Sequence, residues 1–288
     1  MPSCSERTQE QFQGRAILLT GASSGLGRSF AVQLAKCGAK QLILSARKKN
    51  ELEKVAEECK SCSENNNLEV TVLTADLADK ESVAKLCKDA LATAPKIDVL
   101  INCGGVSSRS NFVDTALEVD ERVMQINFLS GAALAKAVVP GMVEEGAGKI
   151  IWISSVQGLV GIPQRTSYAA SKFAVQGYCE ALRGELASIG ITVHVASPGY
   201  IRTNLSTNAV TGDGKNYGKL DPTTAAGADP NDVAIEILDS VTKGRNDFTV
   251  ASSSSATIAI WLRLLCPPLL QWSLVKRFEK AQKKEKEE

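Results

Sequence analysis

A phenol and an amine stand four residues apart in the stretch Tyr168-Ala169-Ala170-Ser171-Lys172, where a segment with helical spacing begins. Side chains four residues apart lie on one face of a helix. A cation close to a phenol favours the phenolate and lowers the phenol pKa from its usual value of about 10. The pair therefore predicts a general acid or base with a lysine beside it. The alternative is a partly exposed aromatic side chain next to a surface charge.

A glycine-rich turn, TGASSGLG at 20–27, joins a short aliphatic run to a segment with helical spacing. Glycines let the backbone approach a pyrophosphate, and the start of a helix offers free N–H groups and the positive end of its dipole. This context predicts a dinucleotide cradle, against the alternative of a simple strand-to-helix turn. The spacing is G-x-x-x-G-x-G, and the residues expected to hold the cofactor are Gly21, Ser23, Ser24, Gly25, Leu26 and Gly27.

The choice between NAD and NADP should be visible about 20 residues beyond the glycines, at the end of the second strand. An acidic residue there would hold the ribose 2′-hydroxyl of NAD, but this chain has Arg47, Lys48 and Lys49. Arg47 is expected to fork the 2′-phosphate of NADP(H) or to stack on its adenine. At least one of the two lysines is expected to be a solvated charge at a helix start.

These residues need a scaffold, and the chain alternates short aliphatic or β-branched runs with helical stretches. Continuous apolar strands that alternate with helices indicate a parallel sheet covered on both faces. Right-handed crossovers then give an α/β, doubly wound (Rossmann) fold with a seven-stranded parallel sheet in a single domain. The expected strands are 16–20, 41–46, 69–74, 98–102, 149–154, 191–197 and 247–251.

The chain divides into a polar N-terminal extension (1–14), an NADP-binding domain (15–255) and a C-terminal segment that is first apolar and then charged (256–288). The extension has no apolar h-region, so we expect an intracellular protein rather than a secreted one. Residues 203–230 are rich in Gly, Thr, Asn, Asp and Ala, and predict a long loop of the kind that acts as a lid or a mobile segment.

Composition narrows the classes further. The 288 residues, 44% of them hydrophobic, suffice for one large core. A net charge of +1 gives no electrostatic basis for binding nucleic acid. The eight cysteines are scattered, which is typical of reduced thiols. Cys59 and Cys62 form a lone CxxC, and because His194 is the single histidine and lies in a strand-like run, we expect no metal site.

Taken together, these motifs resemble the short-chain dehydrogenase/reductase family in their order and spacing, over roughly residues 15–251. Further motifs that carry the resemblance are Asp76-Leu77 after the third strand, Asn102-Cys103-Gly104-Gly105, Ser155, and Ser197-Pro198-Gly199. The chain departs from the family at Cys103, where a second asparagine usually braces the sheet through backbone hydrogen bonds. Since cysteine is a weak hydrogen-bonding group, this puts local rigidity in doubt more than catalysis.

The resemblance implies four catalytic residues. Tyr168 is the general acid for ketone reduction or the base for alcohol oxidation, and Lys172 holds the nicotinamide ribose and lowers the tyrosine pKa. Ser155 donates a hydrogen bond to the substrate carbonyl, so Ser155 and Tyr168 also form the substrate contact. Asn127 supports a water-mediated proton relay to the lysine. The physical argument agrees, because both hydroxyls stabilise the oxygen on which negative charge grows during hydride transfer.

The resemblance also implies further contacts with the cofactor. Asp76 and Leu77 flank the adenine. Ile201 and Thr203 face the nicotinamide carboxamide, and Tyr168 and Lys172 also contact the nicotinamide half. The residues implied to line the cofactor path are Asn102 and Gly104.

The C-terminal run ATIAIWLRLLCPPLLQWSLV (256–275) is just long enough to span a membrane, but Arg263 and Pro267-Pro268 interrupt it. Trp261 and Trp272 suit an interface, so we expect contact with a membrane surface through residues 256–278 rather than a span. The alternative is an ordinary C-terminal helix that packs over the substrate mouth or at a dimer contact.

The stretch 202–227, followed by this apolar run, resembles one subgroup of the family that is linked to lipid-like ketones, including acyl- or alkyl-dihydroxyacetone phosphate. We therefore expect NADP(H)-dependent interconversion of a ketone and a secondary alcohol on an apolar small molecule, at the endoplasmic reticulum or the peroxisome. One alternative is a steroid or retinoid dehydrogenase. Another is a non-catalytic, membrane-associated protein that binds NADPH. The resemblance implies a homodimer or homotetramer formed through the helices that hold Asn127 and Tyr168.

Overall fold

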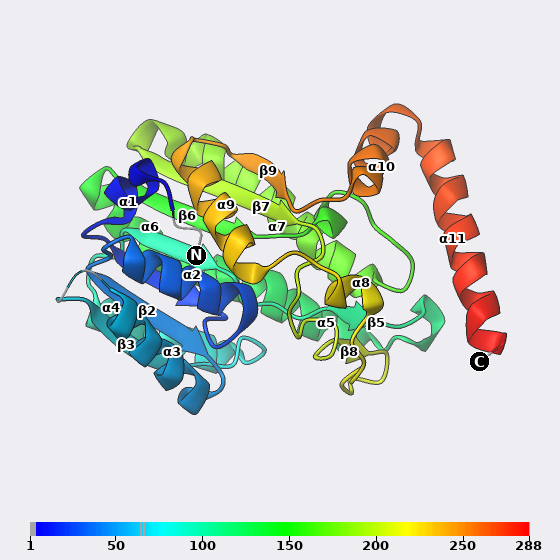
Figure 1. Cartoon of the computed structure of the whole chain (residues 1–288), viewed down its shortest axis with the longest axis horizontal. Coiled ribbons are helices and arrows are strands. Elements are labelled where there is room, and N and C mark those ends of the chain that lie inside the picture. The colour runs from blue at the N-terminus through cyan, green and yellow to red at the C-terminus, as the bar shows by residue number, and fades with distance from the viewer. Residues whose placement is uncertain (1–3, 64, 66, 288) are drawn as a thin grey trace.

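A seven-stranded parallel sheet forms the centre of the computed structural model, which describes residues 4–63, 65 and 67–287 (Figure 1). Its strand order is β3-β2-β1-β4-β6-β7-β9, and every neighbouring pair is parallel. This confirms the predicted doubly wound fold. The strands are β1 (Ala16–Thr20), β2 (Gln41–Ala46), β3 (Glu69–Thr74), β4 (Val99–Asn102), β6 (Gly148–Ile153), β7 (Ile191–Pro198) and β9 (Asp247–Val250).

Helices cover both faces of the sheet. Successive residues of β1 alternate between the two layers, since Ile17 and Leu19 belong to one buried cluster while Ala16 and Leu18 belong to the other. The first cluster holds α2 (Gly25–Lys36), α3 (Lys49–Cys62) and α9 (Pro230–Thr242). The second holds α4 (Lys80–Thr93), α6 (Ser130–Glu145) and α7 (Thr166–Leu186).

The sheet order reverses between β1 and β4, because β2 and β3 extend to one side of β1 while the later strands extend to the other. In open α/β sheets, ligands bind outside the carboxyl ends of the strands at such a point. Thr20 and Asn102 end the two strands at this edge, so the fold itself selects the place for a site.

The N-terminal segment, predicted as a polar extension, contains a helix. Helix α1 (Glu6–Phe12) begins at Ser5, whose side chain accepts a hydrogen bond from the N–H of Thr8. Phe12 is fully buried in the first core cluster, and the Ser5 hydroxyl donates to Asp239 of α9 at 2.9 Å. Residues 6–12 therefore pack on the domain; residues 1–3 lie outside the described residues.

The expected long loop at 203–230 contains regular structure. Its strand β8 (Val210–Thr211) pairs in parallel with β5 (Ser108–Arg109), and it carries the short helix α8 (Pro222–Ala225). The ends of the segment are clasped, because Ile201 bridges to Ala228 and the N–H of Arg202 donates to the Ala228 carbonyl at 2.9 Å. The segment is thus a loop whose two ends lie side by side at the carboxyl edge of the sheet.

One continuous helical stretch, Leu117–Glu145, is long and apolar enough by length and composition to cross a membrane. It comprises α5 (Leu117–Met124), the π-helical turn η2 (Gln125–Leu129) and α6. Buried residues of α6 lie in the second core cluster, and α5 packs against α7. The stretch is therefore a core helix of the domain.

Two C-terminal helices, α10 (Ser254–Leu265) and α11 (Pro267–Glu287), stand outside the layered body (Figure 1). They meet at Cys266, directly before Pro267-Pro268, which explains the break because proline cannot continue the preceding helix. The Arg263 guanidinium lies 4.7 Å from the ring centroid of Phe173 and links α10 to α7. The exposed apolar side chains of this pair are Ile258, Trp261, Leu264, Leu265, Leu269, Trp272 and Val275.

Candidate active site

Tyr168 and Lys172 lie on the same face of α7, as their spacing predicts. The Lys172 amine is 5.7 Å from the centre of the Tyr168 ring, and both residues are only 5% exposed. Lys172 Nζ donates to the carbonyl of Ile153, the last residue of β6, at 2.9 Å. The pair is thus held at the carboxyl edge of the sheet rather than on the surface.

Ser155 faces this pair from the turn after β6. It caps the 3₁₀ turn η3 (Val156–Gly158), and its hydroxyl oxygen accepts from the N–H of Gln157 at 3.1 Å. Its side chain lies near enough to the Tyr168 hydroxyl to lower the pKa of that phenol. The two hydroxyls therefore converge, which is the arrangement needed to hold one carbonyl oxygen between them.

The ionisation of Tyr168 differs from the prediction. Burial raises its pKa above the usual value, and the hydrogen bond from Ser155 and the charges of Arg109 and Arg165 oppose the rise. Lys172 is not among these groups, and its own pKa is lowered to about 8 because burial penalises the ammonium. The cations that favour the phenolate thus come from two arginines that sequence reasoning missed.

Asn127 lies in the π-helical turn η2, an irregularity that often marks functional sites. Its side-chain amide donates to the carbonyl of Val106 and to the Ser171 hydroxyl, both at 2.9 Å, and its oxygen accepts from the Val106 N–H at 2.8 Å. A side-chain carbon added at Gly105 would lie 3.2 Å from Asn127 Oδ1 and 3.6 Å from Lys172 Nζ. Gly105 therefore lies close to both polar groups, and a side chain at this position would crowd them.

The glycine-rich turn forms a cradle that admits no side chains. Gly21 has φ +71°, and a Cβ there would lie 2.8 Å from the Cα of Gly104. At Gly27 a Cβ would lie 2.1 Å from the carbonyl oxygen of Gly21. Real Cβ atoms do not approach so closely, so the turn depends on glycine at both positions.

The start of α2 is open toward this cradle. Ser24 precedes the helix in an extended conformation without a side-chain capping bond, while Leu26 is buried beneath it. Because the first N–H groups of a helix lack intrahelical partners, they can receive a phosphate. Thr203 packs against the turn, since a Cβ at Gly25 would lie 2.9 Å from its methyl group. The cradle, the free helix start and the absence of side chains fit a dinucleotide.

Hydrogen bonds to the backbone hold the segment around Cys103, the position where the chain departs from the family pattern. The Thr20 hydroxyl accepts from the N–H groups of Cys103 at 3.2 Å and of Gly104 at 3.1 Å, which ties the segment to the end of β1. Asn102 is buried, and its amide donates weakly to the Gly131 carbonyl at 3.4 Å. The Asn102 Oδ1 atom has no hydrogen-bond partner among the residues that the structure describes.

The remaining predicted cofactor residues occupy the flanks of the cradle. Arg47 is exposed directly after β2, and Lys49 forms an ion pair of 3.6 Å with Glu53 one turn along α3. Lys49 is thus a solvated charge at a helix start. Asp76 accepts from the N–H of Ala78 at 3.0 Å, and the Leu77 methyl lies where a Cβ of Gly104 would be, at 2.4 Å.

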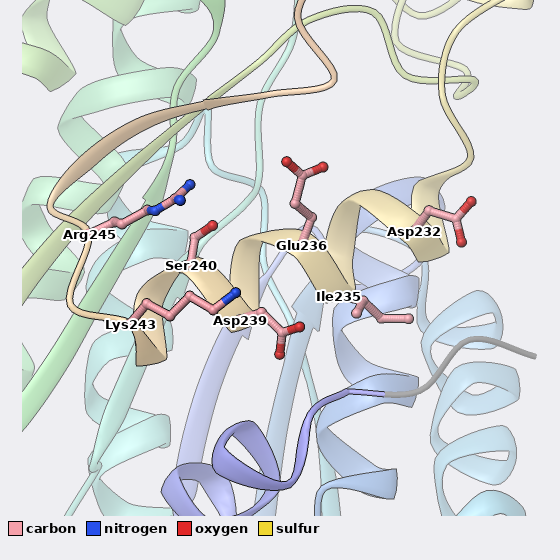
Figure 2. A pocket seen from close by; sticks show the side chains of 7 residues that line it. All are labelled: Asp232, Ile235, Glu236, Asp239, Ser240, Lys243 and Arg245. Carbon is pink, nitrogen blue, oxygen red and sulfur yellow. The ribbon is translucent and has the colours of Figure 1, made fainter.

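A hollow of about 420 Å³ lies elsewhere, along the outer side of α9 (Figure 2). Asp232, Glu236 and Asp239 point from this helix around it, with Lys243 and Arg245 at its other end. It contains none of the residues grouped around Tyr168. It is a polar surface hollow, separate from the candidate active site.

Comparison with known proteins agrees with the fold. The family model described as short chain dehydrogenase matches residues 15–214, and the chain belongs to the short-chain dehydrogenase/reductase family of oxidoreductases. Among its relatives is the dehydrogenase/reductase SDR family protein 7-like of Drosophila melanogaster, 43% identical over 98% of this chain and 86% of the relative. Another is the dehydrogenase/reductase SDR family member 7B of Danio rerio, 43% identical over 97% of this chain and 90% of the relative.

Solved structures agree as well. A short-chain dehydrogenase from Sphingobium yanoikuyae in complex with NADPH is 26% identical, with a TM-score of 0.71 over 94% of this chain and 95% of that one. A short-chain dehydrogenase/reductase from Burkholderia phymatum in complex with NAD shares the fold at 22% identity, with a TM-score of 0.75 over 88% of this chain and 93% of that one.

Proposed function

We propose that this oxidoreductase uses NADP(H) to interconvert a ketone and a secondary alcohol on an apolar, lipid-like substrate of the acyl- or alkyl-dihydroxyacetone phosphate type. The observation that carries the proposal is the convergence of the Ser155 and Tyr168 hydroxyls at the sheet edge, beside a cradle that only glycine can form. A role in lipid metabolism follows from that substrate class.

The residues of the chain supply acid–base and positioning chemistry. The cofactor, when bound, supplies or accepts the hydride. Tyr168 gives its proton to the carbonyl oxygen during reduction and takes it back during oxidation, while Ser155 donates a hydrogen bond to the same oxygen. Because Tyr168 is buried, its neutral form is favoured, which suits the acid needed for reduction.

Lys172 and Asn127 have supporting roles in this proposal. Lys172 holds the nicotinamide ribose with its ammonium group, and Asn127 supports a water-mediated proton path toward it. The side chain of Asn127 is already hydrogen-bonded to Val106 and Ser171, and the second bond fixes η2 against α7. Asn127 can therefore position the site without a direct contact with Lys172.

The preference for NADP(H) rests on Arg47. Its side chain is exposed at the position where an NAD enzyme would carry a carboxylate, and a guanidinium matches the geometry of a 2′-phosphate. A related structure binds NADPH. We expect Arg47→Ala to weaken NADPH binding by about tenfold or more and to leave NADH binding unchanged. Equal affinities of the unsubstituted protein for the two cofactors would contradict this assignment.

The C-terminal helices support a membrane-surface location. Trp261 and Trp272 are 59% and 61% exposed, and Lys276 and Arg277 follow them. An apolar face with aromatic residues and adjacent cations suits a helix that lies in the interface. A lipid substrate would then reach the site from the bilayer, at the endoplasmic reticulum or the peroxisome.

The decisive experiment measures NADPH consumption by the purified protein with acyl-dihydroxyacetone phosphate, a steroid ketone and a retinal in parallel. We expect turnover of the first, reduced by about 10²-fold or more in Tyr168→Phe. Tyr178→Phe is the matched control, because Tyr178 lies on the same helix but packs against Phe128 and Trp152. Turnover of the steroid or retinal alone would replace the lipid assignment. Tight NADPH binding without any turnover would favour the non-catalytic alternative.

A further inference from the structure

Three largely buried charged side chains lie near Tyr168, outside the predicted site. Arg109 ends β5, Arg165 directly precedes α7, and Asp221 directly precedes α8. Their side chains are 8%, 15% and 15% exposed. We call these three residues the arginine cluster.

The arginine cluster has more positive than negative charge. Arg109 donates twice to one carboxylate oxygen of Asp221, from Nε at 2.9 Å and from Nη2 at 2.5 Å. The Arg165 Nη2 atom lies 3.6 Å from the same oxygen. Two guanidinium groups therefore share one carboxylate and leave a net charge of +1 in a largely buried place. Burial and the charge of Arg109 lower the pKa of Arg165 to about 10, so it is still a cation at neutral pH.

The two arginines differ in how their donors are used. Arg109 also donates from Nη1 to the Ser107 hydroxyl and to the Ser108 carbonyl, so it is a strut that holds β5 to the segment with Asp221. Arg165 donates to the Gln164 carbonyl at 3.1 Å, and its Nε atom is buried without a hydrogen-bond partner among the described residues. A buried donor without a partner costs free energy, which indicates that an acceptor belongs beside Arg165.

The backbone directly before Arg165 is unusual. Gln164, the residue before it, has φ +63°, an uncommon value for a residue other than glycine. Arg165 precedes Tyr168 by three residues, and the Tyr168 N–H donates to the hydroxyl of Ser108, the neighbour of Arg109. The charges of both arginines reach the Tyr168 hydroxyl. Neither arginine belongs to the glycine cradle, and both lie near Tyr168 instead.

We propose that Arg165, held in place by Arg109 and Asp221, binds a phosphate monoester carried by the substrate close to its ketone. A guanidinium fork matches the oxygens of a phosphate, and the net positive charge of the arginine cluster offsets part of the phosphate charge. The apolar chain of the substrate then extends away from this subsite. The inference rests on the proposed function, because it assigns a specificity-determining residue to the same active site.

The test measures binding without turnover. Dodecyl phosphate and dodecanol are titrated into the full-length protein saturated with NADPH, so that the cradle and Arg47 are already occupied. We expect the unsubstituted protein to bind the phosphate at least about tenfold more tightly than the alcohol. Arg165→Gln should remove this preference, and Arg165→Lys should restore part of it, because a lysine keeps the charge without the fork. Equal phosphate affinity in Arg165→Gln and the unsubstituted protein would overturn the proposal, as would a lysine variant no better than the glutamine variant.

Arg15→Gln is the matched control. Arg15 pairs with Asp98 at 3.5 Å at the amino end of β1, on the edge of the sheet away from Tyr168, so its loss should leave phosphate binding unchanged. Retained NADPH affinity verifies that each variant is folded. The two proposals fail differently: if no ketone is reduced but dodecyl phosphate still requires Arg165, the catalytic assignment falls and the phosphate subsite stands. If a ketone is reduced in a Tyr168-dependent manner but dodecyl phosphate ignores Arg165, the subsite falls alone.

Discussion

Burial of two ionisable side chains sets the chemistry of this site at the scale of single residues. Tyr168 and Lys172 are both nearly inaccessible, and burial moves their pKa values in opposite directions, since it disfavours the phenolate and the ammonium alike. Each group is therefore held closer to its neutral form than in water. Charges supplied nearby, by the arginine cluster or by a bound cofactor, then decide how easily the proton moves.

The burial of Lys172 makes stability depend on pH. Its pKa is about 8 in the folded chain and 10.5 for an unperturbed lysine, so the unfolded state binds more protons between these values. The contribution of Lys172 to the free energy of unfolding should therefore rise with pH from about 8 to 10.5, by an amount on the order of 3 kcal/mol at most. The buried thiols of Cys59, Cys103 and Cys179 contribute in the opposite direction, because burial raises their pKa values in the folded chain. Urea unfolding at both ends of this range should show the rise as a difference, because the free energy of unfolding of the unsubstituted protein should increase relative to that of Lys172→Met as the pH increases. Lys60→Met, at an exposed lysine of α3, should keep the rise; losing it there too would refute the assignment.

The sequence singled out Tyr168, Lys172 and Ser155, which the structure places together, but it did not indicate the arginine cluster. Tyr168, Lys172 and Ser155 stand in spacings that the family shares, whereas Arg109 and Arg165 meet through the pairing of β5 with β8 and the unusual backbone of Gln164. A two-residue strand has no detectable periodicity, so nothing in the local pattern places Arg109 near Asp221. The one local signal was the position of Arg165, three residues before Tyr168.

At the scale of elements, the cradle is rigid because backbone meets backbone. A Cβ at Gly27 would strike the Gly21 carbonyl oxygen at 2.1 Å, whereas a Cβ at Gly104 would meet only the end of the Leu77 side chain, at 2.4 Å. The Leu77 side chain can move aside, but the backbone carbonyl of Gly21 cannot. Gly27→Ala should therefore weaken dinucleotide binding by about tenfold or more, and Gly104→Ala should change it far less. Calorimetric titration with NADPH checks the order; comparable losses in both variants would contradict it.

The arginine cluster also fastens the 203–230 segment to the body. Asp221→Asn would leave Arg109 and Arg165 facing each other without a counter-charge, and loss of one partner of a buried pair typically costs about 3–5 kcal/mol. We expect faster amide hydrogen exchange across 203–228 in this variant. Asp213→Asn, at an exposed position in the same segment, should leave exchange nearly unchanged. Equal protection in the two variants would show that the buried pair does not hold the segment.

The elements themselves were largely predictable. All seven strands lie within one residue of the expected ranges at either end, because continuous apolar runs between helical stretches are a strong signal of a parallel sheet. Helix α1 and the structure within 203–230 were not foreseen. Phe12 is the single large apolar side chain of α1, and its burial depends on α9, more than 200 residues away in the chain.

At the scale of the whole molecule, the exposed apolar faces of α10 and α11 are a candidate membrane-binding surface. We expect the protein to co-sediment with vesicles that contain anionic lipid, and the double change Trp261→Ser and Trp272→Ser to abolish most of this binding. Val143→Ser, at a 41% exposed apolar position on the body, is the control and should bind normally. Vesicle binding that survives loss of both tryptophans would leave the helices as a packing surface of the domain or of a second copy.

Self-association is the other expectation at this scale. Leu117 and Leu129 are 68% and 44% exposed along α5 and η2, which form the helical stretch through which relatives are expected to pair. We expect sedimentation in detergent to give twice or four times the 30.6 kDa chain mass. A strictly monomeric species over a wide concentration range would remove this expectation.

The clasp between Ile201 and Ala228 has a consequence for how such proteins diversify. Because the two ends of the intervening segment lie side by side and are joined by backbone hydrogen bonds, the segment can lengthen, shorten or be exchanged without disturbing β7 or α9. The proposed catalytic residues Ser155, Tyr168 and Lys172 lie outside this segment, so a change within it would leave them in place. A chimera that carries residues 204–227 of a relative, with Asp221 kept as the partner of Arg109 and Arg165, should take the donor's substrate range and retain its own hydride chemistry.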